Sequence, residues 1–272
     1  MKKNMMFLLL IICLLGCTPK EKLQKENIIE RKDTDIIFSN ASEFISNNQN
    51  EYGYQWFPDK ENENGFLIIK EDCNIEWIKS NFNSIEKYIS VVEFYNQDPE
   101  IVSIFPSCTR IKFFNNKEES IFDLSKLSNK YISVGIKGYD LLNLDSISLI
   151  SDLQYLDISC APTDLDRFES KSLYSLTLDI GDNVMDFSKV IKFNNLKYLE
   201  IQNASSLIDI DAINKLNLEV LYILDETLYE KYIENFNKLK AENNAIDFND
   251  LEKFVQILLE QDEIKEDLSE SY

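Results

Sequence analysis

The chain contains no histidine and only six glycines among its 272 residues. Without histidine it cannot form a catalytic triad with a histidine base or a metal site with imidazole ligands. With so few glycines, it has no glycine-rich loop of the kind that binds phosphate groups. Carboxylates are numerous, so a hydrolase that uses two acids stays open, but no pattern singles out one pair. We therefore expect a protein that is not an enzyme and that needs no cofactor.

Basic residues are also scarce relative to acidic ones, with 28 against 48, which gives a net charge of -20. Such a chain repels nucleic acid and anionic lipid head groups, so we expect neither as a partner. A basic protein or a divalent cation would be attracted instead. Asp157, Asp179 and Glu200 offer one carboxylate on each of three consecutive predicted strands. Calcium needs roughly six to eight oxygen donors, so we expect no metal site there.

The first 16 residues have the features of a secretion signal. Two lysines near the start precede an apolar run over residues 5 to 15, which is too short to span a membrane. The run ends in Leu-Leu-Gly-Cys at Cys17, which resembles the lipobox of bacterial lipoproteins. The resemblance implies that Cys17 is the lipidated first residue of an exported, membrane-anchored protein of the bacterial cell envelope. Thr18 after it implies the outer membrane if the host has two membranes; an ordinary signal peptide with an incidental cysteine is the alternative.

A six-position pattern, leucine-x-x-leucine-x-aliphatic, recurs in the middle of the chain. Its four clear copies begin at Leu153, Leu173, Leu196 and Leu218, which lie 20, 23 and 22 residues apart, and two weaker copies begin at Tyr131 and Cys108. This period is typical of a solenoid whose short strands bury alternate residues against their neighbours. Apolar residues at every third position between the strands, such as Val184, Phe187 and Val190, predict 3₁₀-like return segments.

These copies resemble the leucine-rich repeat family, and the run from Ser206 to Ile213 looks like the 22-residue bacterial type found in internalins. The resemblance covers residues 108 to 226 and implies an α/β solenoid of about six repeats over residues 107–226, with parallel strands on its concave face. The family usually places asparagine three residues after the third apolar position. Only Asn116 does so here, so we expect irregular turns between stacked repeats.

The segments on either side of the repeats predict a tether and two caps. Residues 17–35 are rich in lysine and glutamate and predict a solvated tether. Residues 36–106 predict a small α/β cap with a strand at 66–69. They also predict one helix of about 20 residues, whose apolar face is formed by Ile75, Ile78, Phe82, Ile85, Ile89 and Val92. Residues 227–272 predict a helical cap and an acidic tail. Its helices cover 228–239 and 251–259, and Asn249 with Glu252 caps the second.

Three cysteines remain once the signal is removed and Cys17 is lipidated: Cys73, Cys108 and Cys160. Three cysteines form at most one disulfide bond. A bridge between Cys73 and Cys108 is one interpretation, because both lie in or beside the predicted cap. A buried free thiol at Cys108, which occupies a core position of the repeat, is the other.

The residues between the apolar positions of each predicted strand point away from the core and line the concave face. We expect the early strands to be basic and the later strands acidic, with recurring tyrosines that suit a recognition surface. The candidate partner-binding residues are Arg110, Lys112, Phe114, Tyr155, Asp157, Thr177, Asp179, Tyr198, Glu200, Gln202 and Tyr222. The sequence therefore predicts a protein partner on this face. An envelope scaffold that assembles through its cap helices and a cell-envelope hydrolase are the alternatives.

Overall fold

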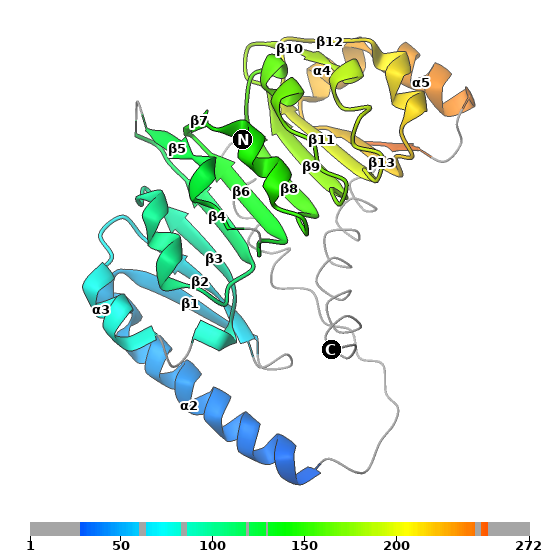
Figure 1. Ribbon diagram of the computed structural model, residues 1–272. Helices are drawn as coiled ribbons and strands as arrows, with labels where there is room; N and C mark the ends of the chain where they lie inside the picture. Colours follow the sequence, from blue (N-terminus) through cyan, green and yellow to red (C-terminus); the bar gives the residue numbers. More distant parts are fainter. Residues whose placement is uncertain are drawn as a thin grey trace.

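The computed structural model describes residues 28–59, 64–82, 86–117, 120–128, 130–242 and 246–249 (Figure 1). The expected signal, the lipidation site Cys17, the helix expected over 251–259 and the acidic tail lie outside the described residues. Within these residues, no helix combines the length and the apolar character needed to cross a membrane.

In the part of the chain that the structure describes, ten strands form one long and mostly parallel sheet. In spatial order the strands are β1 (Tyr54–Asp59), β2 (Asn64–Ile69), β3 (Ile89–Tyr95), β4 (Arg110–Phe114), β6 (Ser133–Lys137), β8 (Tyr155–Ser159), β9 (Ser175–Asp179), β11 (Tyr198–Asn203), β13 (Val220–Ile223) and β14 (Asp247–Phe248). Among these strands only β1 and β2 pair antiparallel. The fold class is therefore mixed α/β with a parallel sheet, as the strand pattern predicts.

Successive strands align so that equivalent apolar residues face one another. Leu176 lies opposite Leu156 on one side and opposite Leu199 on the other. The same register runs from Val92 to Leu221 through Ile111 and Val134, and a parallel row runs from Phe94 to Ile223. These residues are buried in one continuous core. Each leucine removed from water stabilises the fold by about 1.5–3 kcal/mol, so the ladder holds neighbouring strands together.

Short 3₁₀ segments connect the parallel strands, as the spacing of three predicts. They are η3 (Pro99–Ile104), η4 (Leu124–Lys126), η5 (Leu144–Leu149), η6 (Pro162–Arg167), η7 (Phe187–Lys189) and η8 (Ile210–Lys215). Two parallel two-stranded ribbons, which the pattern does not predict, precede some of them. One joins β5 (Ile121–Asp123) to β7 (Asp140–Leu142), and the other joins β10 (Val184–Asp186) to β12 (Ser206–Ile208). We call each sheet strand with its return segment a unit.

The long helix predicted from Ile75 to Val92 is wrong. Helix α3 covers only Ile75–Asn81, and the one-turn η2 (Glu86–Tyr88) leads into strand β3. Ile89, Val92 and Phe94 follow the same spacing as the apolar positions of the repeats, and all three are buried. Because β3 pairs with β4 in the register of the later units, it adds a unit at the N-terminal end of the series.

The N-terminal cap consists of helix α2 (Ile28–Tyr52), the β1–β2 hairpin and α3. The Tyr54 hydroxyl donates a hydrogen bond to the Ile45 carbonyl at 2.7 Å, and the Trp56 indole N–H donates to Ser42 Oγ at 3.0 Å. Helix α2 begins at Ile28, so residues 28–35 of the expected tether are helical; the rest of that tether lies outside the described residues. Lysine and glutamate suit a solvated chain and a helix equally well, which explains the difference.

At the other end, the helix expected over 228–239 is present as α4 (Glu226–Lys231) and α5 (Ile233–Glu242). The short strand β14 then pairs with β13. The helix that Asn249 was predicted to cap lies outside the described residues, and within them Asn249 extends the pairing of β14 with β13. Its side chain accepts a hydrogen bond from the Ile223 N–H at 2.7 Å and donates one to the Ile223 carbonyl at 2.9 Å. The N–H and carbonyl groups of Ile223, beyond the end of β14, are thereby satisfied.

The predicted bridge between Cys73 and Cys108 is absent: neither cysteine forms a disulfide bond, and both side chains are buried. The alternative of a buried thiol outside any disulfide bond is therefore confirmed for Cys108, which donates a hydrogen bond to the Arg110 carbonyl at 3.0 Å.

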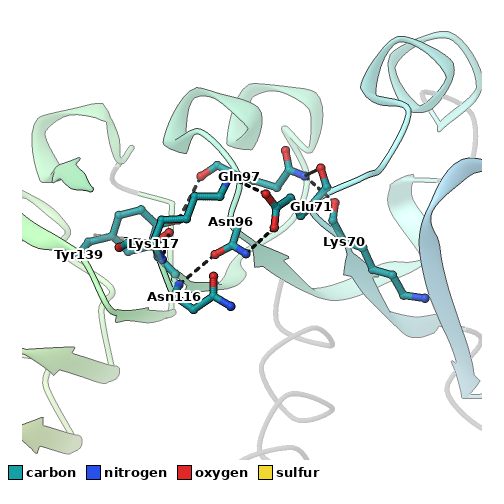
Figure 2. Close-up of polar contacts among 8 residues, drawn as sticks. Lys70, Glu71, Asn96, Gln97, Asn116, Lys117 and Tyr139 are labelled. Carbon is teal, nitrogen blue, oxygen red and sulfur yellow. Dashed lines mark hydrogen bonds and ion pairs between the residues drawn. The ribbon is translucent and has the colours of Figure 1, made fainter. Parts of the chain in front are cut away.

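In the units of β3 and β4, an asparagine lies one position earlier than the family pattern implies. Asn96 and Asn115 follow the third apolar residue of their units by two positions, and the Asn96 side chain accepts a hydrogen bond from the Asn116 N–H at 2.9 Å. Figure 2 shows how these turns join the cap, since Glu71 accepts a hydrogen bond from Asn96 at 2.8 Å and pairs with Lys117 at 2.7 Å. The cap and the first two units are therefore linked by charged and amide groups.

Candidate functional site

The side chains that point away from the core form what we call the outer sheet face, which is the face predicted to be concave. The strand register places the predicted contact residues in adjacent rows. The first row is Arg110, Ser133, Tyr155, Ser175, Tyr198 and Val220, and the second is Lys112, Gly135, Asp157, Thr177, Glu200 and Tyr222. Along β8 the burial alternates, with Leu156 and Ile158 buried and Tyr155, Asp157 and Ser159 half-buried. The register therefore places these two rows on one face, and their role in binding stays a prediction.

Gln202, also a predicted contact residue, has no partner in the pairing of β11 with β9. A bulge in β11 lets Asn203 rather than Gln202 pair with Asp179, and the Asn203 side chain donates a hydrogen bond to Asp179 at 2.9 Å. The Gln202 side chain instead donates to Glu200 at 3.2 Å and accepts a hydrogen bond from the Lys137 ammonium at 2.9 Å. An irregular strand thus brings residues from distant units into contact.

Lys137 is the cation of a polar network on the outer sheet face. Its ammonium group lies 3.0 Å from Asp157 and donates to Gln202, which in turn contacts Glu200. Thr177 donates its hydroxyl hydrogen bond to Glu200 at 3.1 Å. Side chains from β6, β8, β9 and β11 are therefore fixed relative to one another before any partner binds.

Burial shifts the protonation of the two carboxylates in this network. It raises the pKa of Asp157 above its usual value, although the charge of Lys137 acts in the opposite direction. Burial likewise raises the pKa of Glu200, and the charge of Asp157 adds to that effect. Asp157 Oδ1 has no hydrogen-bond partner among the described residues. A buried carboxylate oxygen without a hydrogen-bond donor is unfavourable, so the ion pair with Lys137 does not fully compensate the burial of the Asp157 carboxylate.

Tyr198 is not available to a partner, contrary to the prediction. Only 4% of it is exposed, because the ring packs edge-on against Tyr174 with the centroids 4.9 Å apart. Its hydroxyl donates a hydrogen bond to Glu219 at 3.1 Å, and burial raises its pKa. Tyr155 and Tyr222 stay half-buried on the same face, and the Arg110 guanidinium lies 6.0 Å from the centre of the Tyr155 ring.

Sequence reasoning named Phe114 but missed its aromatic neighbour Tyr95, at the N-terminal end of this face. Tyr95 of β3 stacks on Phe114 of β4 with the ring centroids 5.0 Å apart, and 38% of Tyr95 is exposed. The Tyr95 hydroxyl donates a hydrogen bond to Glu93 at 3.2 Å, and burial raises its pKa. The signal that identifies this pair is the apolar spacing of Ile89, Val92 and Phe94, which was interpreted as a helix.

The predicted change from basic early strands to acidic later strands is weaker than expected. Lys112 pairs with Glu93 at 3.5 Å, and Lys137 pairs with Asp157. Both cations are therefore partly neutralised, whereas Asp179 and Glu200 keep the later strands acidic.

Two hollows lie beside the ends of the central strands. One of about 320 Å³ is lined by residues that include Lys137, Tyr139 and Asp179, and one of about 290 Å³ is lined by Asn96, Lys117 and Tyr139 among others. Neither is lined by Asp157 or Glu200. Among the described residues, no group of three or more carboxylates or cysteines is placed to hold a metal ion.

The chain matches no protein-family model and no curated protein. Among solved structures, a protein from Bacteroides fragilis is similar over 81% of this chain and 85% of its own, with 12% identity and a TM-score of 0.37.

Proposed function

We propose that the chain is an exported bacterial lipoprotein whose leucine-rich-repeat-like solenoid binds a protein through the concave side of its sheet. The lipobox-like ending at Cys17 supports the lipid anchor, which would hold the chain on the cell envelope and on the outer membrane of a host that has two. The membrane contact is made by the lipid alone. The acidic chain does not bind nucleic acid, and the partner is a protein.

The single observation that carries the binding proposal is the strand register. It places alternate residues of at least six parallel strands on one face. On that face Tyr95, which is 38% exposed, stacks on the half-buried Phe114. Phe114 lies beside Lys137 on the next strand, so this aromatic pair adjoins the network of Lys137, Asp157 and Glu200. Aromatic side chains contribute large contact areas at little entropic cost, and fixed charges select the orientation of a partner. This combination suits the recognition of a folded protein.

The geometry supports binding better than hydrolysis. Asp157 and Glu200 are the carboxylates with raised pKa on this face, but neither lines one of the two hollows. Glu200 is also held by Thr177 and Gln202. A general acid needs a pocket that encloses the substrate around it.

Crosslinking on intact cells, followed by identification of the captured species, tests the proposal. The variant Tyr95→Ala/Phe114→Ala removes the aromatic pair, and Leu149→Ser, whose parent residue is 74% exposed on η5, is the matched control. We expect one captured protein to be lost with the double variant and kept with the control. Equal capture by both variants would remove this face from consideration.

The anchor is tested separately. Cys17→Ser prevents lipidation, so the chain should leave the membrane fraction after export while it still binds the captured protein in solution. A chain that stays with the membrane would contradict the lipoprotein assignment.

A further inference from the structure

The two short ribbons lie on the same side of the ten-stranded sheet (Figure 1). Each is formed by the segments that directly follow two neighbouring sheet strands: β5 and β7 follow β4 and β6, and β10 and β12 follow β9 and β11. In each of these units, the ribbon strand lies between the sheet strand and the 3₁₀ segment. They are separate from the outer sheet face that carries the proposed binding site.

Each ribbon buries one face and exposes aliphatic side chains on the other. Phe122 and Met185, the central residues of β5 and β10, are fully buried. The outward positions of the two ribbons hold Ile121, Leu142, Val184 and Ile208, which are 55%, 48%, 39% and 47% exposed. A single exposed aliphatic residue is ordinary on a protein surface. Here, however, both strands of each ribbon expose an aliphatic side chain, and this repetition indicates a binding surface.

The two ribbons come from an internal repeat longer than one unit. Residues 121–127 read Ile-Phe-Asp-Leu-Ser-Lys-Leu, and residues 184–190 read Val-Met-Asp-Phe-Ser-Lys-Val. Asp123 and Asp186 each accept a hydrogen bond at 2.9 Å from the N–H of the serine two residues later. Asn143 and Asp209, which follow the second strand of each ribbon, both have the left-handed backbone conformation, with φ of 56° and 51°. The same local structure is therefore built twice.

The surroundings of both ribbons are acidic. Asp140, Asp182 and Asp209 are exposed beside the aliphatic residues. The lysines of the two repeated segments are paired with carboxylates of the preceding unit, since Lys126 lies 3.5 Å from Glu100 and Lys189 lies 2.6 Å from Asp166. A second copy of this chain, with its net charge of -20, would bring further carboxylates to the rim. Repulsion between the carboxylates of two copies opposes self-association through the ribbons.

We propose that each ribbon docks a basic amphipathic helix of another protein, so that the chain has two equivalent sites of this kind. A helix with leucines on one face and lysines beside them covers the two aliphatic residues of a ribbon and places its cations over the surrounding carboxylates. The exposed side of the ribbons is separate from the outer sheet face, and the helix that binds it is basic whereas this chain is acidic.

Isothermal titration of the full-length chain with a synthetic helical Leu/Lys peptide of about 18 residues tests the proposal. We expect two peptides per chain, with binding that weakens as salt is added. Ile121→Ser/Leu142→Ser and Val184→Ser/Ile208→Ser should each reduce the stoichiometry to one. The quadruple variant should bind at least tenfold more weakly. Leu149→Ser, the matched control outside the ribbons, should bind like the wild type.

The side chains replaced are exposed, so an unchanged unfolding transition is expected for every variant and confirms that the loss is local. The proposal is overturned if the quadruple variant binds like the wild type, or if Leu149→Ser weakens binding as much. It is also overturned if a Leu/Glu peptide binds equally well. Self-association of the wild type, or adsorption to phosphatidylcholine vesicles, would overturn the assigned occupant if the quadruple variant abolished it.

Discussion

Replacing Leu176 by alanine should strongly destabilise the sheet. Leu176 is completely buried and lies between Leu156 and Leu199 of the two neighbouring strands. Deleting three buried carbon atoms from leucine costs about 2–5 kcal/mol, and the cost is largest where the surroundings cannot collapse into the cavity. Because both neighbours are side chains of the same ladder held by main-chain pairing, we expect about 3–5 kcal/mol.

Urea unfolding followed by circular dichroism measures this loss. With a slope of about 3 kcal/mol per molar urea, a loss of 3 kcal/mol lowers the midpoint by about 1 M. Leu149→Ala removes the same atoms from a side chain that is 74% exposed, and should change the free energy of unfolding by less than about 0.5 kcal/mol. A loss below about 1 kcal/mol for Leu176→Ala, or equal losses for the two variants, would refute the ladder as a source of stability.

Three further predictions follow from individual groups. Burial raises the pKa of Asp157 and Glu200, so the folded chain takes up protons there before the unfolded chain does as the pH falls. Their contribution to the free energy of unfolding therefore rises as the pH falls from neutral, and Asp157→Asn/Glu200→Gln should flatten that part of a pH series; a profile unchanged by the double variant would contradict the shift. Gly138→Ala should lower the thermal stability more than Gly181→Ala does. Both glycines have positive φ, but only at Gly138 would an added Cβ lie 1.9 Å from a backbone oxygen. Equal losses of stability for the two variants would exclude this close approach. Asn249→Ala should lower the free energy of unfolding by about 1–2 kcal/mol and speed hydrogen exchange of the β13 amides, because two hydrogen bonds to Ile223 are lost. Amide protection equal to that of the wild type would contradict this role.

The positions of the central strands and the orientation of their side chains were predictable from the sequence. A strand alternates its side chains between two faces, so a shift of one residue would expose every leucine of the ladder. Leu176 and Thr177 therefore had to point to opposite faces once the repeat was aligned. The 3₁₀ returns followed from apolar residues at every third position, because three residues make one turn of that helix.

Strand β3 was not predictable from local spacing. The gap of three between Ile89 and Val92 fits one face of a helix and equally fits the first two apolar positions of a unit. Long-range pairing with β2 and β4 decides between them, and local spacing does not contain that information. The exposed Tyr95 was missed for the same reason.

The fine structure of the candidate site also depended on contacts outside the repeat pattern. Tyr198 is buried because Tyr174, which precedes β9, lies against its ring. Gln202 meets Lys137, 65 residues earlier, beside a bulge that interrupts the pairing of β11 with β9. A residue's place in the repeat gives the face on which it lies, whereas its exposure depends on its neighbours.

Methyl NOEs in a chain with labelled leucine methyl groups test the central claim most directly. The parallel register predicts contacts between Leu156 and Leu176, between Leu176 and Leu199, and between Leu199 and Leu221. It predicts none between Leu156 and Leu221, because three strand spacings of about 4.8 Å separate them. Observing that sequence of neighbours would support the aligned sheet on which the binding proposals rest. Missing neighbour contacts, or a direct contact between Leu156 and Leu221, would contradict it.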